Sequence, residues 1–159
     1  MHSLEDRRAI EDLYIQYNHA VDRHDIDSWV GVYAVDAVFQ GRIRLEGHEQ
    51  IRDFAEGESG RLRRRGYART QHRTSNLIVQ VDGERARATC DLIILLQPID
   101  PRWAYEFLVA SYDDELVKID GRWFFQSRRV DWWPPAVRPA AARQPVRRRI
   151  RRLRRWLTT

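Results

Sequence analysis

The chain has 159 residues, which is the size of one domain with room for a core and a ligand cavity. Hydrophobic residues make up 43% of it, which excludes a disordered polar chain, and no apolar run approaches the roughly 20 residues of a membrane-spanning helix. The net charge of +5 is unevenly placed, because nine Arg and no acidic residue follow residue 137, so residues 1–137 carry −4.

The first segment of the chain, residues 4–23, has the pattern of an amphipathic helix. Ser3 is a suitable N-cap, and Glu5 and Asp6 suit the positive end of the helix dipole. Apolar side chains then recur at helical spacing, at Ile10, Leu13, Tyr14, Tyr17 and Val21. A short second helix is expected from Asp25 or Asp27, both of which are capping residues.

The next segment mixes a strand, a helix and a basic stretch. Residues 38–43 are expected to form a short strand, and residues 47 to about 58 a third helix. Residues 61–69 hold five Arg and Gly66, and we expect an exposed loop there.

After this loop, the spacing of apolar residues changes from that of a helix to that of strands. Four segments rich in β-branched and aromatic residues follow, at 74–81, 85–97, 105–119 and 122–133. Asp82-Gly83 and Asp120-Gly121 each separate two of these segments, which is the strongest short-range signal of a β-hairpin. Helices followed by long antiparallel strands predict an α+β fold, with the helices on one face of a curved sheet.

The chain is expected to divide into two regions of different composition. Residues 1–133 form the folded domain, and residues 134–159 form a linker rich in Pro and Ala and an Arg-rich tail. The tail has apolar residues spaced by four, three and four, at Val146, Ile150, Leu153 and Leu157. A helical tail would suit an anionic surface, and an extension that orders against a neighbouring subunit is equally compatible with this pattern. No specific recognition of nucleic acid is expected.

Four local motifs occur in a characteristic order. They are YNHAVD at 17–22 followed by DSW at 27–29, GHEQI at 47–51, QHRTSN at 71–76 in a strand ending VDG at 81–83, and KIDGRWFF at 118–125 followed by RRV at 128–130. In this order they resemble the SnoaL-like branch of the nuclear transport factor 2-like superfamily, over about residues 4–133. The resemblance implies a cone-shaped, curved antiparallel sheet packed against N-terminal helices, the cystatin-like α+β barrel.

The resemblance is to the part of this superfamily that contains scytalone dehydratase, bile acid 7α-dehydratase and hexachlorocyclohexane dehydrochlorinase. These are eliminating enzymes in which a histidine and an aspartate face each other inside the cone, which points to His72 and Asp22. Tyr17, five residues before Asp22, matches a tyrosine of the bile acid enzyme. The superfamily also holds polyketide cyclases, ketosteroid isomerases and non-catalytic small subunits of ring-hydroxylating dioxygenases, so the fold does not fix the function.

The chemistry of these three residues fits an acid/base role. His72 is suited to remove a proton next to a carbonyl and to return it to a leaving hydroxyl. Asp22 is near the C-terminal end of its helix, where the helix dipole disfavours a carboxylate. A functional reason for this position is that Asp22 would orient the imidazole and stabilise its cation. Tyr17 would polarise a carbonyl. From the residues alone, a solvated Asp22, an exposed His72 and a purely structural Tyr17 remain open.

Four further residues are candidates for substrate binding: Tyr14, Asn76, Asp91 and Arg129. Tyr14 shares a helix face with Tyr17, although an aromatic core residue fits equally well. Strict alternation on the last strand places Arg129 on the same face as Trp123 and Phe125, as the anchor of a cavity wall. An ion pair of Arg129 with Asp131 or Asp91 is the alternative.

No metal or cofactor is expected, because no HxH or HxxxH pair occurs and the single Cys90 cannot form a thiolate cluster. Cys90 is expected to be a small buried residue. The polar N-terminus does not form a secretory signal, so we expect a cytoplasmic protein. The expected partners are a small-molecule substrate and further copies of the chain, as a dimer or trimer.

The sequence therefore predicts a cofactor-independent lyase that performs a dehydratase-type elimination on a small, largely apolar oxygenated substrate. An isomerase or cyclase acting through the same enolate is an alternative. Two further alternatives are a non-catalytic subunit like that of ring-hydroxylating dioxygenases, and a ligand-binding protein in which Asp22 and His72 only anchor a hydroxyl.

Overall fold

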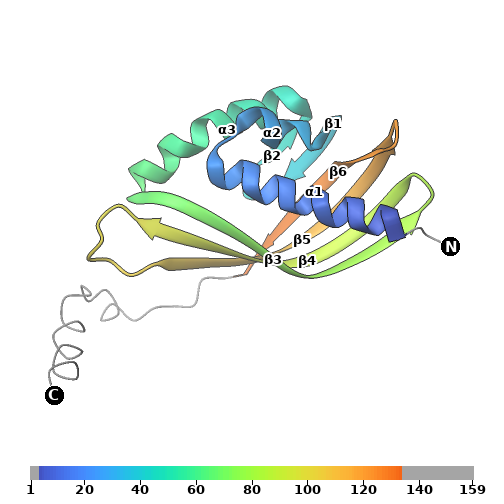
Figure 1. Ribbon diagram of the computed structural model, residues 1–159. Coiled ribbons are helices and arrows are strands. Elements are labelled where there is room, and N and C mark those ends of the chain that lie inside the picture. The colour runs from blue at the N-terminus through green and yellow to red at the C-terminus, as the bar shows by residue number, and fades with distance from the viewer. Residues whose placement is uncertain (1–3, 134–159) are drawn as a thin grey trace, which may run out of the picture.

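The computed structural model describes residues 4–133, in which three helices pack on one side of a curved six-stranded sheet (Figure 1). The helices are α1 (Leu4–Arg23), α2 (Ile26–Gly31) and α3 (Gly47–Arg64). The strands are β1 (Tyr33–Gln40), β2 (Arg44–Glu46), β3 (Tyr67–Asp82), β4 (Arg85–Pro98), β5 (Glu106–Ile119) and β6 (Arg122–Trp132). The predicted α+β class is confirmed, and the proposed tail at 134–159 lies outside the described residues.

The sheet has the strand order β2-β1-β6-β5-β4-β3, and it curves without closing into a barrel. All neighbouring strands are antiparallel except β1 and β6, which are parallel. Strand β3 is thus an edge strand, and helix α1 packs against it. The helices cover one face of the long strands β3 to β6 (Figure 1), and buried side chains from both layers form the core between them.

Helix α1 ends where its pattern predicted, at Arg23. The following His24 has a positive φ of 56°, and the backbone N–H of Asp25 donates to the carbonyl of Ala20 at 2.9 Å. This left-handed residue after the last turn is a common helix termination. It fixes Asp22 in the last turn, close to the neighbouring strand.

The prediction of an exposed loop at 61–69 is wrong. Helix α3 continues to Arg64, a turn follows at Arg65 and Gly66, and β3 begins at Tyr67. Leu62 is buried in the core, which gives this last part of the helix a tertiary contact, and Arg61 packs its guanidinium 4.3 Å from the centre of the ring of Phe54 in the same helix. The predicted strand at 38–43 is also displaced, because β1 ends at Gln40 and β2 begins at Arg44.

The two predicted hairpins are present. Asp120 and Gly121 join β5 to β6 with φ values of 48° and 79°, and a positive φ at both central residues is typical of a type I′ turn. Between β3 and β4 the register pairs Asp82 with Arg85, so the two-residue loop is Gly83-Glu84, one residue later than predicted.

A β-bulge in β6 changes which of its residues face the core. Leu116 pairs with Phe125 whereas Glu115 pairs with Ser127, which leaves Gln126 as the extra residue. A single extra residue reverses the alternation of the faces beyond it. Arg128 therefore points inward and is fully buried, and Arg129 points outward, contrary to the strict alternation that the sequence suggested.

The core fills the space between helices and sheet with aliphatic and aromatic side chains. Phe125 is the centre of an aromatic group, since it contacts the rings of Tyr14, Tyr17 and Tyr33 with centroid distances of 5.2 to 5.8 Å. Cys90 is buried in the core, as predicted. None of the helices within residues 4–133 is long and apolar enough to cross a membrane.

Candidate active site

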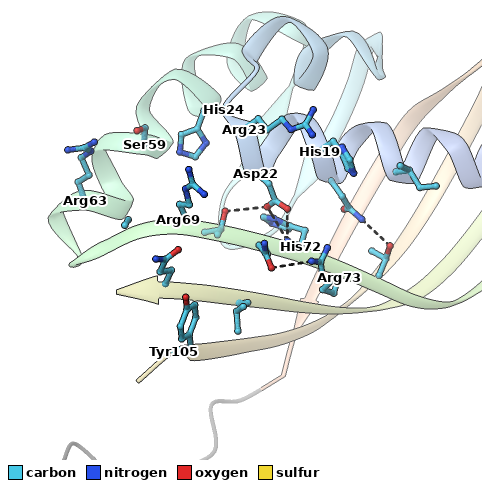
Figure 2. A pocket seen from close by; sticks show the side chains of 18 residues that line it. His19, Asp22, Arg23, His24, Ser59, Arg63, Arg69, His72, Arg73 and Tyr105 are labelled. Atoms are coloured by element: carbon cyan, nitrogen blue, oxygen red, sulfur yellow. Dashed lines mark hydrogen bonds and ion pairs between the residues drawn. The ribbon is translucent and has the colours of Figure 1, made fainter. Parts of the chain in front are cut away.

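Asp22 and His72 are in direct contact, although 50 residues separate them in the chain (Figure 2). The Nδ1 atom of His72 lies 2.7 Å from Oδ1 of Asp22. The backbone N–H of His72 also donates to both carboxylate oxygens, at 3.0 and 2.9 Å. The Thr70 hydroxyl lies 3.4 Å from the same carboxylate. Asp22 thus accepts from the backbone and the side chain of one residue, which fixes both groups.

The contact leaves one nitrogen of the imidazole for other chemistry. When Asp22 accepts the Nδ1 proton, the neutral tautomer has its lone pair on Nε2. Among residues 4–133, Nε2 of His72 has no hydrogen-bond partner. The side chains of His72 and Asp22 are 10% and 18% exposed, so they are shielded from solvent but still accessible.

His72 borders a cavity of about 360 Å³ inside the cone. The walls are largely aliphatic and aromatic, and include Tyr17, Trp29, Phe54, Leu92, Tyr112 and Trp132. Asp22 is not among the residues that line this cavity, but it lines a groove on the other side of His72. The imidazole therefore separates its carboxylate partner from the apolar space, where a ligand of moderate size can be enclosed.

Tyr17 lies in the wall of this cavity and is almost completely buried. Its ring makes edge-to-face contacts with Trp29 and Tyr112, at centroid distances of 6.5 and 6.2 Å. Helix α1 places Tyr17 in the lining of the cavity. Asp22 follows about one and a half turns later and contacts Nδ1 of His72. Tyr17 thus shares the lining of the cavity with His72, whereas Asp22 contacts His72 from outside the cavity.

Tyr14, predicted to bind substrate, is not among the residues that line the cavity. Its hydroxyl donates a short hydrogen bond to Asp114, which is completely buried. Asp114 also accepts two hydrogen bonds from Arg128, at 3.0 and 2.7 Å. Burial, together with the negative charge of Asp114, raises the pKa of Tyr14 well above its ordinary value, so its hydroxyl stays protonated.

Arg128 and Asp114 form a buried ion pair that the sequence did not predict. The guanidinium of Arg128 lies 4.2 Å from the ring centre of Tyr17 and 4.0 Å from that of Tyr112, both of which line the cavity. Burial alone would lower the pKa of Arg128, but the Asp114 carboxylate raises it well above its ordinary value. The positively charged guanidinium of Arg128 thus packs on the rings of two tyrosines that line the cavity.

The remaining candidates, Arg129, Asn76 and Asp91, are not among the residues that line the cavity. Arg129 is half exposed and pairs with Asp113 at 2.6 Å and with Asp131 at 3.4 Å. Asn76 has a positive φ of 55° at an irregularity in β3, and it donates to Asp91 at 2.7 Å. Its role is thus to stabilise a bulge, which explains why an Asn occurs there.

No group of three or more His, Cys, Asp or Glu side chains within residues 4–133 is arranged to hold a metal ion. The family model of the SnoaL-like domain matches residues 2–129, which is most of the chain and includes Asp22, His72 and Arg128.

The chain belongs to the SnoaL-like domain family.

The fold of this SnoaL-like chain is similar to that of several solved structures. A candidate scytalone dehydratase from Novosphingobium aromaticivorans is 20% identical, with a TM-score of 0.73 over 90% of this chain and 94% of that one. A hexachlorocyclohexane dehydrochlorinase is 22% identical, with a TM-score of 0.69 over 84% and 97%. A candidate aromatic ring hydroxylase from N. aromaticivorans is 27% identical, with a TM-score of 0.71 over 85% and 94%. No curated protein matches the sequence.

Proposed function

We propose that this SnoaL-like protein is a lyase that performs a dehydratase-type elimination without a cofactor, on a small and largely apolar oxygenated substrate. The observation that carries the proposal is the 2.7 Å contact between Asp22 and Nδ1 of His72, with Nε2 of His72 unpartnered beside an apolar cavity. This is the arrangement expected of a positioned general base. The fold is shared with a candidate scytalone dehydratase and a dehydrochlorinase, so elimination is a reaction that this fold can carry.

In the proposed reaction, Nε2 of His72 removes a proton from the carbon next to a carbonyl. The electron pair of that C–H bond forms an enolate, and the enolate then collapses to the carbon–carbon double bond as the bond to the β-hydroxyl breaks. The imidazolium then gives its proton to the departing hydroxyl, which leaves as water. Asp22 stabilises the transient cation through the Nδ1 hydrogen bond, and the Tyr17 hydroxyl donates a hydrogen bond to the carbonyl oxygen as negative charge develops, keeping its own proton.

The cavity supplies the second requirement of this reaction, which is exclusion of water from the enolate. Its aromatic walls suit a ring system or a short aliphatic chain with one or two oxygens. Isomerisation or cyclisation would proceed through the same enolate and the same three residues, because the outcome depends on what the substrate offers as a leaving or accepting group. The leaving group therefore decides between these reactions.

A panel of β-hydroxy ketones of increasing ring size tests the proposal, with formation of the conjugated enone followed by its absorbance. We expect turnover of at least one member, and we expect His72→Gln to reduce kcat by about 10²–10⁴-fold. Asp22→Asn should reduce it similarly, because the amide cannot stabilise the cation. Arg129→Gln is the control, since this residue lies outside the cavity and should leave kcat unchanged. Equal rates for His72→Gln and the wild type would refute the proposed role of His72.

A second candidate is a non-catalytic subunit of a ring-hydroxylating oxygenase, which the likeness to a candidate aromatic ring hydroxylase favours. That function requires a partner chain and leaves Asp22 dispensable. Co-purification with an iron–sulfur subunit, together with an Asp22→Asn variant that assembles and functions normally, would support this candidate against the lyase.

A further inference from the structure

We propose that the groove outside the Asp22–His72 pair binds a phosphate-class anion that is covalently attached to the apolar body of the substrate. This inference rests on the proposed function, because it extends the substrate of that same site. The groove has a volume of about 1000 Å³ and lies between the C-terminal ends of α1 and α3 and the edge strand β3 (Figure 2).

The groove carries a large excess of positive charge. Four arginines line it: Arg23 from α1, Arg63 from α3, and Arg69 and Arg73 from β3. Asp22 is the single acidic residue of the lining, and it already accepts hydrogen bonds from His72. Within residues 4–133, none of the four arginines forms an ion pair with a carboxylate.

Structural roles account for each arginine separately but not for their arrangement. Arg23 and Arg63 lie in the last turns of their helices, where a cation is favourable, and charges on an edge strand oppose aggregation. Neither effect requires that the side chains surround one hollow. Elsewhere within residues 4–133, some exposed arginines pair with carboxylates, as Arg52 and Arg129 do, and others such as Arg8 do not. The distinguishing feature of this groove is that four arginines without ion pairs line one hollow.

The groove and the apolar cavity meet at the imidazole. His24, Thr70 and His72 line both spaces, so the two spaces adjoin at these three residues. Figure 2 shows Arg69 reaching from β3 toward His24, beside the Asp22–His72 pair. An apolar body in the cavity would therefore place a charged end among the arginines. The planar guanidinium, with its fork of donors, matches the oxygens of a phosphate group.

Binding of three small probes to the full chain tests this inference by calorimetry: 1-naphthyl phosphate, 1-naphthol and inorganic phosphate. We expect 1-naphthyl phosphate to bind about 10-fold or more tightly than either 1-naphthol or inorganic phosphate, because it alone fills both spaces. In the double variant Arg63→Gln, Arg69→Gln this advantage should be lost, while the affinity for 1-naphthol stays unchanged. Arg8→Gln is the matched control, as an exposed arginine at the opposite end of α1.

Three results would overturn the inference. One is equal affinity for 1-naphthyl phosphate and 1-naphthol in the wild type. Another is the same loss in Arg8→Gln as in the double variant, which would indicate non-specific charge attraction. The third is inorganic phosphate binding as tightly as 1-naphthyl phosphate, which would indicate a site for a free anion. Because the measurement is of binding, it gives a result even if no elimination is catalysed, so failure of the proposed function remains a separate finding.

Discussion

Two buried acid–base pairs in this molecule differ in what their surroundings allow them to do. Arg128 and Asp114 have no exposed surface, and rings of the core enclose the guanidinium, so this pair cannot exchange protons with a ligand. His72 and Asp22 keep part of their surface open to a cavity and to a groove. These surroundings agree with the proposed proton transfer at His72, whereas Arg128 holds the core and the tyrosines around it.

The structural role of Arg128 predicts a large loss of stability when it is replaced. Arg128→Met would leave the Asp114 carboxylate buried without its partner, which typically costs about 3–5 kcal/mol. Arg129→Met is the matched control, because its ion pairs are half exposed, and we expect a loss of about 1 kcal/mol or less. Urea denaturation measures both variants. Equal losses would contradict the assignment of Arg128 to the core.

Cys90 provides a second test at this scale, since it is the only cysteine. Burial raises the pKa of its thiol to about 12, so at neutral pH the group is both inaccessible and protonated. We expect a disulfide reagent such as Ellman's reagent to react with native protein only as fast as the chain opens, and rapidly in urea. Reaction of the native protein at the rate of a free thiol would show that this part of the core is open.

At the scale of helices and strands, local signals predicted some elements and tertiary contacts decided others. The helix that holds Asp22 and the Asp120-Gly121 turn depend on neighbouring residues, so the sequence was sufficient for them. The bulge at Gln126 depends on how β6 pairs with β5, and no local signal marks it. It explains why Arg129 was placed in the cavity wall and Arg128 was missed. The arginines around residue 63 suggested a loop, because the burial of Leu62, which continues the helix, depends on the core around it.

The turn between β5 and β6 predicts a stability difference between two glycine substitutions. A Cβ added at Gly121 or at Gly31 would meet no atom within 4 Å, but only Gly121 has a positive φ, of 79°. Gly121→Ala should therefore destabilise the protein by about 1–2 kcal/mol through backbone strain alone. Gly31→Ala should be neutral or stabilising by up to about 1 kcal/mol, because it lies in helix α2. Urea midpoints compare the two variants, and a reversed order would contradict the turn geometry.

At the scale of the whole molecule, the cone brings together residues that no sequence window contains. Asp22 comes from α1 and His72 from an edge strand, while the cavity draws its walls from helices and strands alike. The family resemblance placed Asp22, His72 and Tyr17 in one region, which their spacing alone did not establish. The groove was not predicted, because its four arginines belong to three different elements.

The packing of the cone also predicts how the stability of the whole protein depends on pH. Burial raises the pKa values of Tyr33, Tyr112 and Cys90 above their ordinary values of 10.0, 10.0 and 9.0. The unfolded chain then releases protons at a lower pH than the native protein does. The free energy of unfolding should therefore be highest below about pH 8 for these groups and should fall as the pH rises past about 9. A urea midpoint that is the same at about pH 8 and pH 10.5 would contradict this.

The most direct test of the central claim, that His72 is a base aimed at a carbon next to a carbonyl, is the exchange of such a proton with solvent. 1-Tetralone can be incubated with the protein in D₂O, and the loss of its α-proton signal followed by NMR. We predict that the wild type accelerates this exchange and that His72→Gln and Asp22→Asn reduce the acceleration by about 100-fold or more. If the wild type and His72→Gln exchange the proton at the same rate, His72 is not the base, and the account of this site is wrong.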